Sequence, residues 1–177
     1  MNQEQIAGMR VTTYLLEDDG TFPNNPLLPL VILENAFLSD GADDPGKLES
    51  VFRMNDWRGS WRNGLYPFHH YHSTAHEVLG IFRGSLRAQF GGEAGPVVMP
   101  TSGDVVIIPA GVAHKNLWSS HDFRVVGAYP SGQSWDMNYG KIGERPAADK
   151  NISSVPLPEN DPVLGKKGPL VKLWNIG

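Results

Sequence analysis

The chain has 177 residues, and 40% of them are apolar, which suits one globular domain and excludes a disordered chain. The formal net charge of −4 gives no general attraction to nucleic acid or anionic membranes. Cysteine is absent, which excludes disulfides, thiolate metal sites and cysteine nucleophiles. The start of the chain lacks the layout of a signal peptide, and no apolar run approaches the ~20 residues of a membrane span. We therefore expect a cytoplasmic protein with no nucleic-acid or membrane partner.

The first half of the chain predicts two strands and one helix. Residues 9–16 are expected to form the first strand, and Leu27 to Phe37 is apolar without alternation, which indicates a strand buried on both faces. The single convincing helix runs from Pro45 to about Trp57, with Asp44 as its N-cap and Pro45 at its first position. We assign this helix to packing and not to chemistry.

The stretch from Gly64 to Gly84, GLYPFHHYHSTAHEVLGIFRG, contains four histidines and one glutamate. A strand alternates its side chains between two faces, so His70 and His72 are expected on one face. Ser73 to His76 has the composition of a polar turn. If the chain then returns as a hairpin, Glu77 faces the interior together with these two histidines, and buried imidazoles and a carboxylate are costly without a partner.

Two further histidines of this stretch, His69 and His76, have the opposite parity. They are expected to point away from His70 and His72, toward the surface or a subunit interface. His121 lies in the turn SSHD and is expected to be solvated.

A second stretch, Gly103 to His114, contains an apolar strand, a Pro/Gly turn and a histidine that opens the next strand. The segments 85–90, 97–99 and 123–129 predict further strands. From Pro130 onward strand periodicity is lacking, and the tail is expected to pack across the barrel as loops or to cap its mouth.

These two stretches resemble the signature motifs of the cupin superfamily. The first motif, Gly-x5-His-x-His-x3–4-Glu-x6-Gly, matches at Gly64, His70, His72, Glu77 and Gly84. The second motif, Gly-x5-Pro-x-Gly-x2-His-x3-Asn, matches at every specified position except the final Asn; the matching residues are Gly103, Pro109, Gly111 and His114. Flanking segments such as DDGTFPNNPLLPL and WDMNYGKIGERP also look like small bacterial single-cupin proteins of unassigned activity.

The resemblance implies the fold and the domain organisation. We expect an all-β chain, a cupin-type small β-barrel or double-stranded jelly roll with one short helix before the first motif. One domain is expected to span residues 1–177, with the barrel core at about 27–130 and a loop-rich tail at 131–177. As in many small cupins, a homodimer is expected, with the apolar Leu27–Leu33 run in a sheet continued across a two-fold axis.

The resemblance also implies a metal centre with three histidines and one glutamate. The expected ligands are His70, His72, Glu77 and His114. This donor set suits one divalent transition metal, Fe, Mn, Ni, Zn or Cu, whose identity the sequence leaves open. Four protein ligands on an octahedral ion leave two positions for water, substrate or O2.

The second motif departs from the family where Trp118 occupies the position of its Asn. By strand parity His114, Asn116 and Trp118 share one face, so Trp118 is expected to narrow the pocket and Asn116 to point into it. Six residues are therefore candidates for the pocket lining, with core packing as the alternative for the apolar ones: Phe68, Leu79, Ile81, Phe90, Asn116 and Trp118.

Two classes of function fit this reading. The first is a metal-dependent enzyme acting on a small oxygenated molecule, most simply a dioxygenase-type oxidoreductase, with decarboxylation or isomerisation as variants. The second is a non-catalytic module that binds a metal or a small ligand, as a sensor or a storage protein. A fold alone does not decide between them. The complete ligand set and the absence of a DNA-binding segment favour the enzyme, although no dedicated general acid or base can be named.

Overall fold

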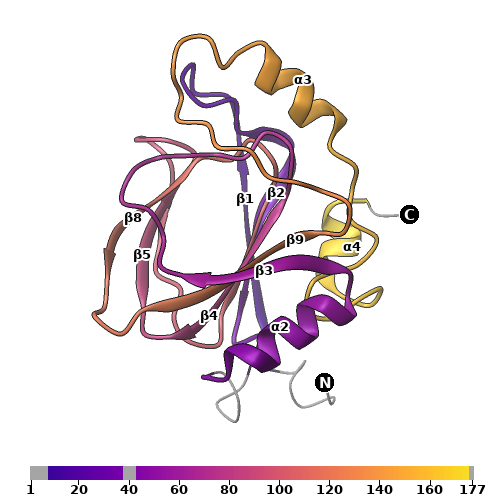
Figure 1. The fold of residues 1–177 in the computed structure, drawn as a ribbon. Helices are drawn as coiled ribbons and strands as arrows, with labels where there is room; N and C mark the ends of the chain where they lie inside the picture. Colours follow the sequence, from indigo (N-terminus) through magenta and orange to yellow (C-terminus); the bar gives the residue numbers. More distant parts are fainter. Residues whose placement is uncertain (1–7, 38–42, 176–177) are drawn as a thin grey trace.

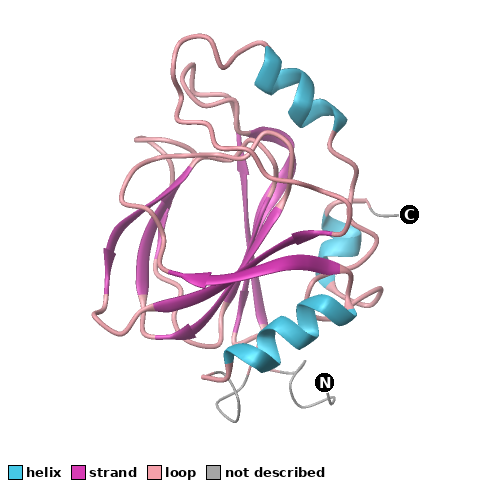
Figure 2. Ribbon diagram, viewed as in Figure 1, coloured by secondary structure: helices cyan, strands magenta, loops and turns pink. Residues whose placement is uncertain are grey.

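The computed structural model describes residues 8–37 and 43–175, and this part of the chain is built mostly from antiparallel strands (Figure 1, Figure 2). The all-β prediction is confirmed. The strands are β1 (Arg10–Leu16), β2 (Asn25–Glu34), β3 (Trp57–Asn63), β4 (Glu77–Arg83), β5 (Leu86–Phe90), β6 (Val97–Val98), β7 (Val105–Ile108), β8 (His114–Ser119) and β9 (Arg124–Pro130).

The strands form two sheets, one of six strands in the order β1-β2-β7-β4-β9-β3 and one of three strands in the order β6-β5-β8. Alternate residues of the larger sheet pack against the smaller one. Leu79 and Ile81 of β4, for example, share a buried cluster with Leu86 and Phe90 of β5. This cluster is the interior of the double sheet, and it places Leu79 and Ile81 inside, as their parity predicted.

The opposite face of the six-stranded sheet is also covered, so β7 is buried along its whole length. Helix α2 (Pro45–Met54) and the short helix α4 (Pro169–Leu173) pack there, and Phe52 and Trp174 join the same buried cluster as Val78. Gly80 faces helix α2: a Cβ at Gly80 would lie 2.7 Å from the Leu48 side chain. The continuous apolar runs in the sequence are thus explained by burial on both sides.

Helix α2 begins as predicted, because the Asp44 side chain accepts a hydrogen bond from Gly46 N–H and Pro45 occupies the first turn. Its predicted end at about Trp57 is wrong. The helix ends at Met54, and Asp56 adopts a left-handed conformation with φ 62° that turns the chain into β3. Strand β3, which begins at Trp57 and pairs with β9, had no signal in the sequence.

The tail after β9 is not made of loops alone. It forms helix α3 (Ala147–Ser154) and helix α4, and Figure 1 shows α3 above one end of the sheets and α4 beside α2. Trp174, just after α4, is buried and donates from Nε1 to the Pro29 carbonyl at 2.9 Å. The tail is therefore part of the folded core.

Strand β2 is hydrogen-bonded to β1 on one side and to β7 on the other. Val31–Leu33 therefore lie in the interior of the sheet, whereas Leu27 at the start of the run is 84% exposed. Among the helices of the described residues, none is long and apolar enough to cross a membrane.

Candidate metal centre

The histidines of the two motifs are brought together by backbone pairing. His70 N–H donates to the His114 carbonyl at 3.2 Å, and His114 N–H donates to the His70 carbonyl at 2.9 Å. The segment around His70 is an isolated bridge and not one arm of a hairpin with β4, so the predicted hairpin is wrong. The side chains nevertheless converge, because β4 reaches the same place through its pairing with β7 and β9.

Each of the three motif histidines directs one ring nitrogen at a backbone carbonyl. The contacts are His70 Nδ1 with Phe68 O at 3.2 Å, His114 Nδ1 with Val112 O at 3.1 Å, and His72 Nδ1 with Asp136 O. A carbonyl only accepts, so Nδ1 is the donor in each ring. The three Nε2 atoms are therefore the nitrogens available as ligands.

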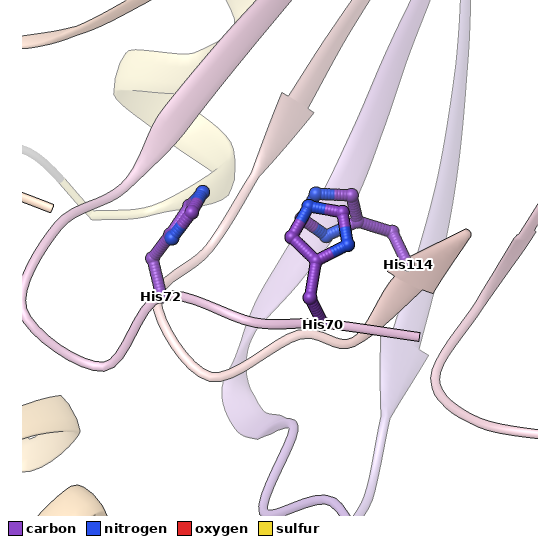
Figure 3. A group of neighbouring side chains, drawn as sticks. All are labelled: His70, His72 and His114. Atoms are coloured by element: carbon purple, nitrogen blue, oxygen red, sulfur yellow. The ribbon is translucent and has the colours of Figure 1, made fainter. Parts of the chain in front are cut away.

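The three rings gather around one point (Figure 3). One ligand nitrogen from each of His70, His72 and His114 lies within 4.8 Å of the others, and all three residues are buried. The ring centroids of His70 and His114 are 4.2 Å apart. Nε2 of His114 is buried without a hydrogen-bond partner. Buried polar atoms of this kind commonly bind a metal ion or an ordered water molecule.

Glu77, the first residue of β4, is buried beside this group. Its Oε2 lies 3.6 Å from His72 Nε2 and 3.4 Å from His114 Nε2. Burial alone would raise the pKa of Glu77, but the charge of His72 and the close approach of the His72 and His114 rings lower it well below its ordinary value. Glu77 is therefore an anionic group inside the fold.

The electrostatics of the histidines follow from the same neighbours. Burial, with a smaller contribution from His114, lowers the pKa of His70 to about 3, so this ring is neutral at physiological pH. Burial also disfavours the charged form of His72, but the Glu77 carboxylate outweighs burial and raises its pKa. A cation that binds between Glu77 and His72 therefore competes with a proton for the His72 ring.

This donor set fits a divalent first-row metal. Three imidazole nitrogens and a carboxylate oxygen suit Fe, Mn, Ni, Zn or Cu, and a closed structural site would leave no cavity beside them. The group lies at the wall of a cavity of about 320 Å³. The cavity is lined by Gly59, Trp61, Arg62, Asn63, Gly64, Leu65, Tyr66, His70, His72, Glu77, Tyr129, Trp135 and Met137.

The six side chains expected to line the pocket are absent from this wall. Trp118 is 53% exposed, because a β-bulge between β5 and β8 changes the parity of the strand after Asn116. Trp118 lies opposite the exposed Arg87, on the outer face of the small sheet. The pocket is consequently not narrowed by an indole at this position.

The other predicted lining residues lie around the site and not in it. Phe68 is 43% exposed beside the cavity mouth, with its ring 5.9 Å from that of His70. Leu79 and Ile81 are core residues. Phe90 is fully buried and packs behind the His114 ring, 6.1 Å away between centroids.

Tyr129 is a site residue that had no signal in the sequence. Trp61 Nε1–H donates to the Tyr129 hydroxyl at 2.9 Å. Burial, and then the charge and hydrogen bonding of Glu77, raise the pKa of Tyr129 far above its ordinary value. The hydroxyl thus stays protonated, accepts a hydrogen bond from Trp61 of β3 and lies near Glu77 of β4. Only the long-range pairing of β3 with β9 creates this arrangement, which is why spacing along the chain did not reveal it.

Asp136 in the tail supports the site from behind His72. Its carbonyl orients His72, and its carboxylate accepts from Ser73 N–H at 2.6 Å and from Thr74 N–H at 3.3 Å. Its neighbours Trp135 and Met137 line the cavity. The tail therefore both closes the cavity and orients one of its histidines.

The remaining histidines do not join the group. His69 packs against the Phe22 ring, 5.2 Å away, on the other side of the segment. His76 is buried, accepts from Ala110 N–H at 2.9 Å and packs on Trp174. Burial lowers the pKa of His76 to about 3, and its place is in the core and not at the surface expected for it.

No family model matches the chain. It is 48% identical over 162 residues to YjlB of Bacillus subtilis (strain 168), a protein described as uncharacterized, and the match covers 92% of this chain and 95% of YjlB.

Similar solved structures include the acireductone dioxygenase from Bacillus anthracis with cadmium in its active centre (14% identity, 77% of this chain and 85% of that one, TM-score 0.42). Another is the dTDP-6-deoxy-D-glucose-3,5-epimerase from Legionella pneumophila (14% identity, 69% and 72%, TM-score 0.40). The two motifs, paired through His70 and His114 at one end of an antiparallel double sheet, are those of a cupin-type fold. The chain belongs to the same family as YjlB.

Proposed function

We propose that this protein is a metal-dependent cupin enzyme, a dioxygenase-type oxidoreductase that acts on a small oxygenated molecule. Its centre would hold one divalent transition metal through His70, His72, Glu77 and His114. The substrate would occupy the adjoining aromatic cavity of about 320 Å³.

One observation carries the proposal: three histidines anchored through Nδ1 present their free nitrogens beside a buried carboxylate at the wall of a cavity. Burying an anionic carboxylate among histidines costs free energy, because unpaired buried charges are costly. Core packing alone therefore does not account for this group beside an accessible cavity. A metal ion bound there supplies Lewis-acid and redox chemistry to molecules in the cavity.

The protein's own groups would orient the metal ligands and exclude water from the cavity. The carbonyls of Phe68, Val112 and Asp136 fix the three rings, and the Tyr129 hydroxyl lies near Glu77. Trp61 also lines the cavity and with its aromatic neighbours limits the access of water.

The polar groups of the cavity favour chemistry centred on the metal over catalysis by a separate acid or base. The Tyr129 hydroxyl accepts a hydrogen bond from Trp61, and its pKa is raised far above the ordinary value by burial and by Glu77. Arg62 forms a bidentate ion pair with Glu49 at 2.7 and 2.8 Å. Among the described residues that line the cavity, no carboxylate or histidine remains beyond the proposed ligands. The same observation fits the non-catalytic alternative, a module that binds a metal or a small ligand.

The test begins with metal removal and reconstitution with Fe(II), Mn(II), Ni(II), Zn(II) or Cu(II), followed by elemental analysis. Oxygen consumption is then measured against pools of small oxygenated molecules, with His72→Ala as the metal-free control. Turnover that depends on the metal and is absent in His72→Ala supports the enzyme. Stoichiometric metal with saturable ligand binding but no turnover of any pool supports the binding module instead, and absence of stoichiometric metal contradicts both.

We also propose that the chain acts as one domain and as a homodimer. Strand β1 is an edge of the six-stranded sheet, and Val11 and Leu15 on it are 39% and 57% exposed, with Leu27 of β2 84% exposed. Light scattering at micromolar concentration tests the dimer, and a monomer mass contradicts it.

A further inference from the structure

A second cavity, of about 900 Å³, lies on the other side of the β3 terminus from the metal centre. It shares with the first cavity only the short stretch from Arg62 to Leu65. Its wall is formed by Pro45, Arg62, Asn63, Gly64, Leu65, Phe82, Arg83, Asn116, Ser119, Ser120, His121, Phe123 and Arg124. The described lining thus contains three arginines, one histidine and several amide and hydroxyl groups, without a carboxylate.

Two of these arginines lie directly opposite each other. Arg83 at the end of β4 and Arg124 at the start of β9 are partners in the antiparallel ladder. Like charges at directly opposed positions of a sheet destabilise it. Arg62, by contrast, has its charge balanced by Glu49.

The charge of the opposed arginines is offset only in part. Among the described residues, neither Arg83 nor Arg124 forms a salt bridge with a carboxylate; Arg124 donates to the Phe123 carbonyl at 2.6 Å. Asp122 in the neighbouring turn has its pKa lowered, first by the Ser120 hydroxyl and to a smaller extent by Arg83. It does not line the cavity, so the wall itself remains positive on a chain whose net charge is −4.

The wall also holds an unpartnered amide. Asn116 Nδ2 donates to Ser119 Oγ at 3.2 Å, while its Oδ1 is buried without a hydrogen-bond partner. A buried polar group left over in this way indicates a missing ligand or water.

We propose that this second cavity is a binding site for a phosphate-type oxyanion, held by Arg83 and Arg124. A phosphate monoester carries about −1.5 to −2 charges at pH 7, which matches two arginines without salt bridges. Guanidinium groups bind such tetrahedral oxyanions through paired, charge-assisted hydrogen bonds. Binding would also relieve the repulsion across the β4–β9 ladder. The site is separate from the metal centre, so it does not depend on the function proposed above.

Isothermal titration at constant ionic strength tests the proposal, with inorganic phosphate, glycerol phosphate, sulfate and acetate as probes and chloride as the balancing salt. The variants are Arg83→Gln, Arg124→Gln and the double substitution. Arg87→Gln is the matched control, because Arg87 is exposed on β5 and lies outside the cavity wall. Phosphate and sulfate are expected to bind and acetate to bind far more weakly. Each cavity substitution is expected to weaken binding about tenfold, the lower end of what a charge-assisted hydrogen bond contributes, while Arg87→Gln leaves it unchanged.

The comparison of glycerol phosphate with inorganic phosphate identifies the source of the anion: tighter binding of the ester indicates a phosphorylated metabolite, and equal or weaker binding indicates free phosphate. A second measurement guards against misfolded variants. At low salt without phosphate, the thermal midpoints of Arg83→Gln and Arg124→Gln should equal or exceed that of the unmodified protein, because one member of a like-charged pair is gone. Absence of phosphate binding, or equal loss in the Arg87→Gln control, overturns the proposal.

Discussion

His70 and His114 exchange both of their backbone hydrogen bonds, although 44 positions separate them in the chain. This pairing places their ring centroids 4.2 Å apart before any side-chain contact is considered. Backbone hydrogen bonds therefore align the two motif segments, and this alignment brings the His70 and His114 rings together. The first prediction follows from it.

Replacing either His72 or His114 by Ala is expected to abolish stoichiometric metal binding, since each removes one of the few anchored nitrogens of the site. Glu77→Gln should weaken binding as well, because it removes the anionic group while keeping its volume. Elemental analysis of reconstituted protein measures the effect. His69→Asn is the control, because His69 lies on the other side of the segment against Phe22. Loss of metal in His69→Asn together with full metal in His72→Ala would contradict the proposed ligand set.

His76→Ala separates stability from metal binding. The substitution removes the acceptor for Ala110 N–H and the packing on Trp174, and an unsatisfied buried donor costs about 1–3 kcal/mol. We expect a lower free energy of unfolding in urea and an unchanged metal content in the protein that remains folded. A variant that keeps its stability but loses its metal would assign His76 to the site.

Asp136→Ala is expected to lower the metal affinity about 10–100-fold, the usual effect of removing support behind a ligand. The carboxylate accepts hydrogen bonds from Ser73 N–H and Thr74 N–H. These bonds hold the backbone at Asp136 in place, and the carbonyl of Asp136 orients His72. A competition titration with a chromophoric chelator measures the affinity. Asp149→Asn is the matched control, because Asp149 pairs with Arg145 away from the site. Equal affinities in both variants would remove Asp136 from the supporting groups.

Tyr129→Phe is expected to weaken metal binding about tenfold or more, because Glu77 loses the neutral hydroxyl beside it. Trp61 Nε1–H also loses its acceptor, which should reduce the free energy of unfolding by about 1–3 kcal/mol. Chelator competition and urea denaturation separate the two effects. In Trp61→Phe the hydroxyl can still reach Glu77, so its metal affinity should exceed that of Tyr129→Phe; the reverse order would be inconsistent with the assigned role of Tyr129.

Trp174→Ala should destabilise the fold by about 3–5 kcal/mol, the range for deleting a buried aromatic side chain. Trp174 is 1% exposed and bonded to the Pro29 carbonyl. Urea denaturation of the variant measures the change. A loss below about 1 kcal/mol would mean that the tail packs only loosely on the sheet.

The sequence predicted those features that depend on local spacing. The start of α2 at Pro45 and the inward parity of Leu79 and Ile81 follow from patterns of a few residues, and the all-β fold was implied by the resemblance of the two motifs to those of cupins. The positions of His70, His72, Glu77 and His114 were expected from the motif spacing, and the structure places them together.

The features that the sequence did not predict depend on contacts between distant segments. A single bulged residue in β8 turned Trp118 outward, and no pattern in the sequence announces a bulge. Tyr129 and Trp135 reach the cavity through β9 and the tail, whose placement depends on tertiary packing. The helices α3 and α4 are short and rich in polar or Pro-flanked residues, so their periodicity was too weak to detect.

The tail places Trp135 and Met137 in the cavity wall and the carbonyl of Asp136, between them, on His72. The part of the wall formed by Trp135 and Met137 is thus continuous in the backbone with the Asp136 carbonyl that orients His72. A molecule large enough to push this wall outward also rotates the imidazole away from its neighbours. The size of the molecules that the cavity tolerates is therefore tied to the geometry of the metal centre, and enlarging the cavity at Trp135 by mutation would leave that backbone connection intact.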